Sequence, residues 1–386
     1  MKKILTLCFL FSLLFLSCTD REERPRPCIP NPADSNITEN IEVENIFDTL
    51  DSYFRFQGYL HYSGKYGLAE WERQAAIDIL PAWAITKGAG VRIAVFDDNI
   101  QANHEDLKGI TVWNVRDGSN SVEPEPDDSL GNMYSHGLAV SGLIAAQKNG
   151  IGIIGIAPES DLLFIGDGVG EFSDADIVKA FEHARNWGAR IISCSWGSYN
   201  ASQSFENLVK SFYNQGITIV FAAGNDGLNM DTDRYRGRPI NDESELPWVI
   251  GVSASNSRGV LTTRESGSFW SSNFGSNIDI MAPGDRILTL DLMGFSDGNG
   301  LTGTNYAFES GTSFSAPIVA GVVALMLSAN PNLTPSEIRQ IIFDTARKNP
   351  VEIRGGRYDS NCFSLHHAHG LINAGRAVER AYELRK

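Results

Sequence analysis

Short apolar segments rich in β-branched residues alternate along this chain with longer stretches typical of helices. After Trp71 the apolar runs lie at 91–96, 162–165, 190–194 and 217–221, and the helical stretches lie at 136–146, 174–187, 204–214, 313–329 and 334–344. Runs of this kind suit strands that are buried on both faces. Strands that alternate with helices predict an α/β fold with a mostly parallel sheet and helices on both of its faces.

Polar residues stand at the ends of several of these apolar runs. Asp97, Ser195 and the pair Gly224-Asn225 each follow a predicted strand. Ligands of parallel α/β sheets bind beyond the carboxyl ends of the strands. We therefore expect the functional residues to gather at that edge of the sheet.

The N-terminus is typical of an export signal, which we assign to residues 1–17. Lys2 and Lys3 precede an apolar run from Ile4 to Leu16, and a polar stretch follows. A bilayer span needs about 20 apolar residues, so the run is too short. The last four residues, Phe15-Leu-Ser-Cys18, resemble a bacterial lipobox, in which Cys18 would be acylated. We expect lipid anchoring to a membrane of a bacterial cell envelope, with plain secretion as the alternative.

Between this signal and the regular pattern lies a polar segment, residues 18–63. It opens with a proline-rich stretch that suits a tether, because proline interrupts helices and central strands. Residues 41–62 hold enough aromatic side chains to fold as a small extension against the main domain, which we place at 64–386.

Composition narrows the possible partners. The 386 residues are 42% hydrophobic and 20% charged, as expected of a globular chain, and carry a net charge of -15. A surface of this sign repels a phosphate backbone, so we expect no nucleic acid partner. We expect a monomer.

Five cysteines are present, of which Cys8 lies in the signal and Cys18 at its end. Cys28, Cys194 and Cys362 remain, and three residues cannot all pair within one chain. Export permits one disulfide, and the sequence does not identify it. Cys194 lies in an apolar run, which favours a buried free thiol.

Three residues suggest hydrolysis by an activated hydroxyl. That chemistry needs a serine, a histidine that takes its proton and a carboxylate that orients the histidine. Asp97 ends a predicted strand, and His136 and Ser313 each open a predicted helix, where exposed amides are available. Taken singly, each residue also fits a structural role such as a turn or a helix cap.

The flanking residues make the combination more specific. They form motifs in the order Ile93-Ala-Val-Phe-Asp97, His136-Gly-Leu-Ala-Val-Ser-Gly-Leu-Ile-Ala-Ala146, Phe221-Ala-Ala-Gly-Asn-Asp-Gly227, Met281-Ala-Pro-Gly284 and Ser310-Gly-Thr-Ser-Phe-Ser-Ala-Pro317. Together they resemble the subtilisin-like serine peptidases over roughly residues 64–386. The resemblance implies a three-layer subtilisin-like fold and an exported serine endopeptidase that cleaves protein or peptide substrates.

The resemblance also implies a role for each residue. Ser313 would be the nucleophile, His136 the general base and then acid, and Asp97 the orienting carboxylate. Asn225 and the backbone N–H of Ser313 would stabilise the oxyanion. The substrate would lie extended between two backbone edges that match the family's pairing segments, Gly168, Val169, Gly170 and Ser195, Trp196, Gly197.

A structural calcium ion is the cofactor that the resemblance implies. The loop after residue 146 keeps the alternating spacing of the family's calcium loop, and the ligands would be Asp106, Gln147, Asn149, Ile151 and Ile153. A glycine-rich turn that is stable without metal is the alternative. His366, His367 and His369 lack the spacing of a zinc site.

Some details resemble the kexin-like branch, and others depart from the family pattern. Asp98 matches an acid that faces a basic P2 side chain in that branch, but the acids that favour basic P1 after Ser-Trp-Gly are absent. Leu138, Asn99 and Ser141 replace residues common in the family. The changes at Leu138 and Asn99 motivate an alternative, a catalytically silent binding lipoprotein of the same fold. An α/β-hydrolase esterase conflicts with the order Asp, His, Ser.

Overall fold

The protein is described by a computed structural model that covers residues 51–62, 72–107, 109–123, 135–294, 303–348 and 357–385. The expected signal, Cys18, Cys28 and the tether lie outside these residues.

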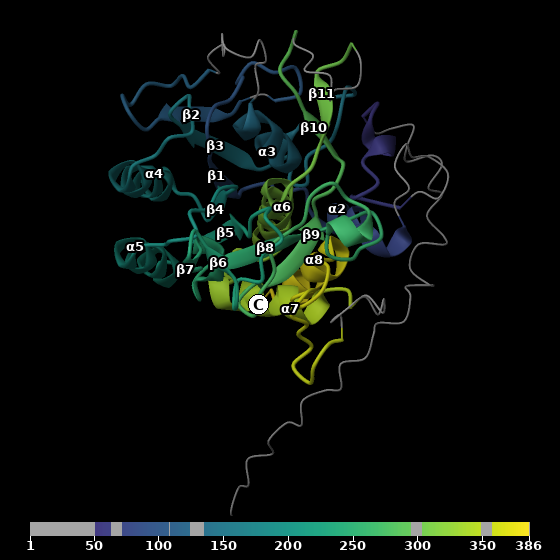
Figure 1. Cartoon of the computed structure of the whole chain (residues 1–386). Helices are drawn as coiled ribbons and strands as arrows, with labels where there is room; N and C mark the ends of the chain where they lie inside the picture. The colour runs from purple at the N-terminus through teal and green to yellow at the C-terminus, as the bar shows by residue number, and fades with distance from the viewer. Residues whose placement is uncertain are drawn as a thin grey trace, which may run out of the picture.

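A seven-stranded parallel sheet forms the centre of the molecule, as the alternating pattern predicts (Figure 1). Its strand order is β2-β3-β1-β4-β5-β8-β9. The strands are β1 (Arg92–Phe96), β2 (Thr111–Asn114), β3 (Asp161–Gly166), β4 (Ile191–Cys194), β5 (Thr218–Ala222), β8 (Ile250–Ser255) and β9 (Ile280–Pro283). Two antiparallel pairs lie outside it: β6 (Arg234–Tyr235) with β7 (Arg238–Pro239), and β10 (Ile287–Leu290) with β11 (Tyr306–Glu309).

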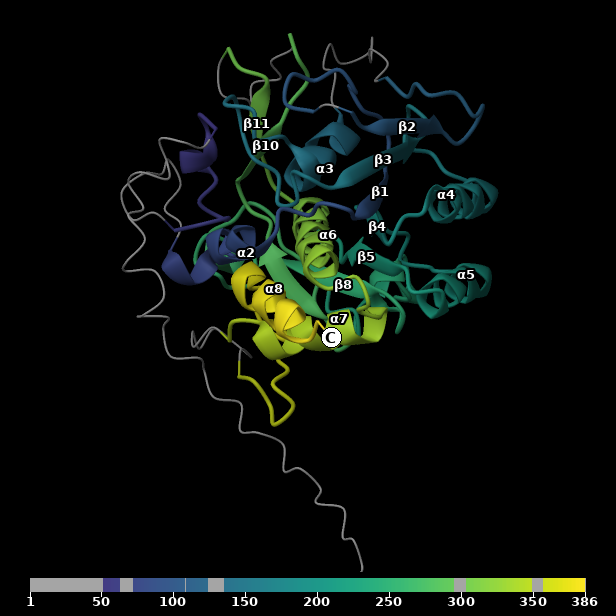
Figure 2. The same ribbon diagram turned by 180° about the vertical axis from the view of Figure 1, so that it is seen from behind.

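One face of the sheet carries the larger apolar core. Its helices are α2 (Ile79–Ile85), α3 (His136–Ala145), α6 (Thr312–Ala329), α7 (Pro335–Thr345) and α8 (Ala374–Glu383). Figure 2 shows α6 in the middle of this layer, with α2 and α8 beside it. Among the described helices, α6 alone is long and apolar enough to cross a membrane, yet 89% of it is buried inside the protein. Its apolar character therefore reflects its central position in the core.

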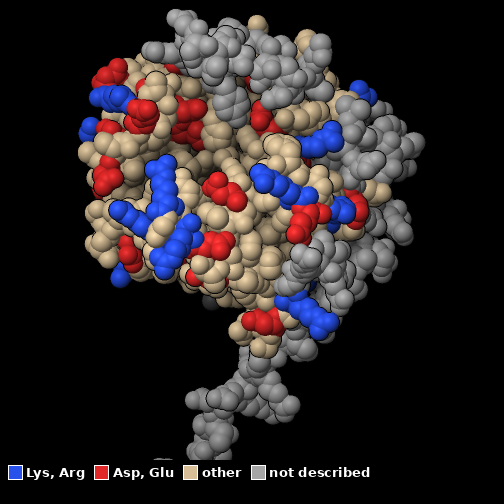
Figure 3. All heavy atoms as spheres, in the orientation of Figure 1, with Lys and Arg blue, Asp and Glu red and all other residues tan. Residues whose placement is uncertain are grey.

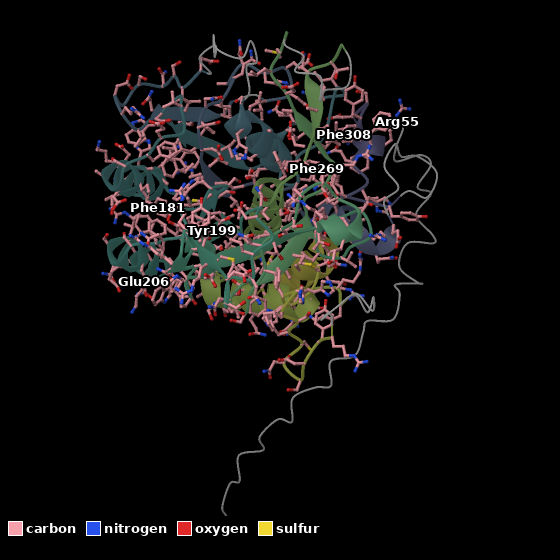
Figure 4. The ribbon with its side chains drawn as sticks, viewed as in Figure 1. Arg55, Phe181, Tyr199, Glu206, Phe269 and Phe308 are labelled. Atoms are coloured by element: carbon pink, nitrogen blue, oxygen red, sulfur yellow. The ribbon has the colours of Figure 1, made fainter. Side chains whose placement is uncertain are left out.

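The opposite face is covered by α4 (Asp174–Trp187) and α5 (Gln203–Asn214). Figure 4 shows Phe181 between these two helices, where its ring lies 5.6 Å from that of Phe212. Ser173 caps α4 in a capping box with Asp176, which explains the sharp start of the helix. With helices on both faces, the molecule has the three-layer architecture expected from the sequence.

Residues 51–62 pack against the larger core. Phe54 and Tyr59 are 3% and 1% exposed, and a short 3-10 turn, η1, spans Phe54–Phe56. Gln57 exchanges two 2.9 Å hydrogen bonds with the backbone of Ile154. Further 3-10 turns are η2 (Arg73–Ala75), η3 (Glu243–Glu245) and η4 (Arg264–Ser266).

The two described cysteines differ in state. Cys194 is a free, fully buried thiol at the end of β4, as its apolar surroundings predict. Cys362 is disulfide-bonded. Burial raises the pKa of the Cys194 thiol well above its ordinary value, so we expect it to be unreactive.

Candidate active site

A carboxylate and an imidazole meet at the carboxyl edge of the sheet. Asp97 follows β1 and is 4% exposed, and His136 is the first residue of α3, whose N-cap is Ser135. Nδ1 of His136 lies 2.7 Å from Oδ1 of Asp97. The same oxygen accepts a 2.9 Å hydrogen bond from the backbone N–H of Asp98. These contacts hold the imidazole with Nδ1 as the donor, which leaves Nε2 as the nitrogen able to accept a proton.

Opposing effects set the pKa of His136. Burial lowers this pKa, but the charge and hydrogen bond of Asp97 and the charge of Asp98 outweigh burial and raise it to about 9. The protonated imidazole is therefore stabilised by two carboxylates. A base of this kind gives up its proton only in alkaline solution.

Asp98 lies beside the Asp97–His136 pair. Its Oδ1 accepts hydrogen bonds from the backbone N–H groups of Gly137, at 2.8 Å, and Asn99, at 2.5 Å. Burial and the neighbouring charge of Asp97 raise the pKa of Asp98 to about 6. Asp98 thus connects the end of β1 to the first turn of α3.

Ser313 is the second residue of α6 and is half-buried. Its hydroxyl donates a 3.1 Å hydrogen bond to the carbonyl of Ser195, whose own hydroxyl donates to the carbonyl of Ser313 at 2.8 Å. The next residue, Phe314, has its ring centroid 5.7 Å from that of His136. Backbone N–H groups in the first turn of a helix have no partner within the helix, so the N–H of Ser313 can bind a substrate oxygen.

Asn225 lies beside the start of α6. Its Oδ1 accepts hydrogen bonds from the backbone N–H of Thr312 at 2.9 Å and from the Thr312 hydroxyl at 3.0 Å. The Thr312 hydroxyl in turn accepts from the backbone N–H of Gly224 at 3.0 Å. Because these contacts occupy the oxygen end of the carboxamide, its NH₂ group is left to act as a donor.

A cleft of about 530 Å³ opens beside these residues. It contains several of the expected site residues, namely Asp97, Asp98, His136, Val169, Gly170, Ser195, Trp196 and Gly197. Its acidic lining residues are Asp97, Asp98, Asp174 and Glu243, and no Lys or Arg is found among the described residues that line it. Figure 3 shows acidic side chains bordering a hollow in the upper left of the face seen in Figure 1.

The expected calcium loop surrounds a buried carboxylate. Asp106 is fully buried, and its oxygens accept hydrogen bonds from the side chain of Asn149 at 3.1 Å and the N–H of Ile153 at 3.0 Å. Burial raises the pKa of Asp106 to about 7, and the charge of Asp51 contributes to the increase. The two neighbouring carboxylates are oxygen donors of the kind that a hard cation binds, so these residues fit calcium. Asn149 faces Asp106 with its NH₂ group, and its carboxamide would have to turn to offer its oxygen to an ion.

Among the described residues, no group of three or more His, Cys, Asp or Glu side chains is arranged to hold a metal ion. The rings of His366 and His369 instead stack on aromatic rings, with centroid distances of 4.4 Å to Phe274 and 3.7 Å to Phe343.

Sequence reasoning missed three residues that contact the expected site. Thr312 orients Asn225, and Asp51 accepts hydrogen bonds from the N–H groups of Asn149 and Gly150 at 3.1 and 2.7 Å. Asn273 accepts from the N–H groups of Asp226 and Leu228 and thereby holds the loop of Asn225. Thr312 adjoins Ser313 in the motif, which is a usable signal. Asp51 and Asn273 are far from their partners in sequence, and no local motif indicated their role.

Comparison with known proteins identifies a family for most of the chain. The model of the Subtilase family, Peptidase_S8, matches residues 88–376. Subtilisin E of Bacillus subtilis (strain 168) is 32% identical over 294 residues, which cover 76% of this chain. A thermostable alkaline protease of Halalkalibacterium halodurans is 34% identical over 294 residues, which cover 76% of this chain and 68% of that protein. The chain spans 66% of the length of subtilisin E and of subtilisin NAT.

Solved structures show the same fold. A protease from Pseudoalteromonas arctica aligns with a TM-score of 0.66 and 25% identity over 86% of this chain and 99% of its own. The serine protease of Aeromonas sobria, solved in complex with its chaperone, aligns with a TM-score of 0.71 and 24% identity over 87% of this chain and 68% of its own.

Proposed function

The chain belongs to the Subtilase family, and from this premise we propose that it is an exported serine endopeptidase. Ser313 is the nucleophile, His136 the general base and acid, and Asp97 the carboxylate that orients His136. The observation that carries the proposal is the 2.7 Å contact of His136 with Asp97 at a cleft that also contains Ser195, the hydrogen-bond partner of Ser313. The same contact argues against the silent binding lipoprotein, which has no need of an ordered base.

The reaction follows from these positions. The Ser313 hydroxyl turns from the Ser195 carbonyl towards Nε2 of His136, gives up its proton and attacks the scissile carbonyl. The amide of Asn225 and the N–H of Ser313 stabilise the negative charge that develops on the carbonyl oxygen. His136 then gives its proton to the leaving amine, and water releases the acyl group from Ser313 by the same steps.

Peptide substrates bind in an extended conformation between residues 168–170 and 195–197. Backbone pairing of this kind tolerates many sequences, so the side-chain pockets decide the preference. The described lining of the cleft carries Asp98, Asp174 and Glu243 without a Lys or Arg, which favours basic substrate side chains. Asp98 lines the cleft, and its Oδ1 accepts from two backbone N–H groups, so it is the residue best placed to select them.

Calcium binding is part of the proposal and involves Asp51 in addition to the expected loop. Asp106, Asn149 and Asp51 would supply side-chain oxygens, and Gln147, Ile151 and Ile153 would supply backbone carbonyls. The ion would neutralise the two buried carboxylates and fix the loop to residues 51–57. It takes no part in the hydrolysis.

The proposal also includes export and lipid anchoring at Cys18. This part of the proposal rests on the sequence alone. Expression of the full chain with a labelled fatty acid tests it. We expect label in the membrane fraction for the wild type and none for Cys18→Ser.

Digestion of casein and of a peptide library tests the activity itself. We expect cleavage by the wild type and none by Ser313→Ala at matched concentration and matched melting temperature. Cleavage that persists in Ser313→Ala would contradict the proposal.

A further inference from the structure

The edge of the cleft formed by residues 168–170 is built around one buried carboxylate, that of Asp167. Its side chain is 0% exposed. Oδ1 accepts hydrogen bonds from the N–H groups of Val169 at 2.9 Å and Gly170 at 2.6 Å, and Oδ2 accepts from the N–H of Glu171 at 3.3 Å. Three successive backbone amides are therefore tied to the side chain that precedes them.

This turn needs its glycines. Gly168 and Gly170 have φ angles of +92° and +78°, in the left-handed region. A Cβ on Gly170 would lie 3.1 Å from Cβ of Asp98, so the edge also packs closely against the end of β1. The conformation leaves the side chain of Val169 55% exposed at the cleft.

One cation compensates the buried charge. Arg116, just beyond β2, donates to Oδ2 of Asp167 from Nε at 3.0 Å and from Nη2 at 2.6 Å. Nη2 also donates to the carbonyl of Glu171 at 2.9 Å. Arg116 thus holds both ends of the turn, the carboxylate at its start and the carbonyl at its end. Loss of Arg116 leaves the buried carboxylate of Asp167 with its three backbone donors alone, which destabilises this conformation of the turn.

We propose that Arg116 is a positioning residue for substrate binding, because through Asp167 it fixes the backbone edge at residues 168–170 against which an extended peptide lies. The inference rests on the proposed peptidase function. With the N–H groups of Val169 and Gly170 already bound to Asp167, the edge offers substrate its carbonyl groups and the Val169 side chain. A substrate long enough to reach this edge depends on Arg116, and a short one does not.

Steady-state kinetics of Arg116→Gln with two substrates test the inference. One substrate is a peptide with at least four residues before the scissile bond, and the other is a single-residue ester. For the long peptide we expect KM to rise about tenfold with kcat nearly unchanged, the effect of losing one charged hydrogen-bonded partner. For the ester we expect KM and kcat to change by less than about twofold, since the ester does not reach the edge at residues 168–170.

Two further variants complete the design. Lys179→Gln removes a surface cation that pairs with Asp176 at 3.3 Å in the neighbouring helix, and we expect it to leave both substrates unaffected. Arg116→Lys keeps the charge but lacks the fork that reaches Asp167 and Glu171 together, so we expect an intermediate KM for the long peptide. It also serves as the test variant if Arg116→Gln does not fold.

The outcomes separate the two proposals. If KM of Arg116→Gln rises equally for both substrates, or does not rise for the long peptide, the proposed role of Arg116 is overturned. Absence of wild-type labelling by a fluorophosphonate would overturn the peptidase function instead. Labelling of the wild type and of Arg116→Gln together with a selective rise in KM supports both.

Discussion

Nδ1 of His136 lies 2.7 Å from Oδ1 of Asp97, and Asp98 binds the N–H of the following residue, Gly137, at 2.8 Å. Two carboxylates therefore act on one imidazole, one directly and one through its charge and the first turn of α3. This arrangement raises the pKa of His136 to about 9 although burial opposes the increase.

The pH dependence of activity follows from that pKa. A general base works only when it is unprotonated, so kcat/KM is low below the raised pKa and increases as the pH passes through about 9. We expect kcat/KM of the wild type on a peptide substrate to rise from pH 7 and to level off only above about pH 10. A profile that is already flat at pH 7 would contradict the arrangement.

Asp98→Asn should move this profile. The charge of Asp98 raises the pKa of His136, so its removal lowers that pKa and shifts the rising limb to lower pH, by about one unit. Asp174→Asn, which removes another carboxylate of the cleft, is the matched control and should shift the limb less. The measurement is the pH profile of kcat/KM for the three proteins. Equal shifts in both variants would assign the effect to the general charge of the cleft.

Asn225→Ala should reduce turnover with little change in KM, because its amide acts on charge that exists only in the transition state. In a subtilisin, removal of one oxyanion-hole donor lowers kcat by about 10² to 10³, and we expect a loss in that range. Thr312→Val should lower kcat by about tenfold, since Asn225 then loses one of the two hydrogen bonds that orient it. Initial rates over a range of substrate concentrations give kcat and KM for both variants. A change confined to KM would contradict the role of Asn225.

Calcium should stabilise the protein, and more at alkaline than at acidic pH. The pKa of Asp106 is raised to about 7, so protons compete with the ion and its affinity falls as the pH drops through about 7. We expect chelation to lower the melting temperature by about 5 to 10 °C at pH 8 and by less at pH 6. Asp106→Asn and Asp51→Asn should lose most of this response, and Asp161→Asn, an exposed carboxylate on β3, should keep it. If chelation still lowers the melting temperature of Asp106→Asn as much as that of the wild type, the calcium ion binds elsewhere in the protein.

Much of the fold could be predicted because its signals are local. Asp174–Trp187 was expected at the bounds that α4 has, and β1, β3, β4, β5, α3 and α6 lie within one residue or so of the predicted bounds. Continuous apolar runs are a reliable signal for strands buried on both faces. β8 and β9 were missed, since glycine and serine interrupt the first, Ile250–Ser255, and the second, Ile280–Pro283, ends in a proline.

The candidate site likewise contains residues that local motifs predict and residues that no local motif predicts. Asp97, His136 and Asn225 stand in short motifs, and the contact of Asp97 with His136 could be expected from them, whereas the contact of Asn225 with Thr312 was not predicted. The support around these residues is formed by distant parts of the chain. Asp51 contacts a loop about one hundred residues away, and Arg116 reaches Asp167 across 51 positions. No local pattern reports such contacts, because they exist only once the sheet has brought the segments together.

The site of covalent labelling by a fluorophosphonate tests the central claim most directly. The wild type is labelled above pH 9, digested, and the modified peptide is identified by mass spectrometry, with Ser313→Ala and His136→Ala treated in parallel. We expect the label on the hydroxyl of Ser313, none in Ser313→Ala, and a rate lowered by several orders of magnitude in His136→Ala. A label on another residue, or undiminished labelling in either variant, would contradict it.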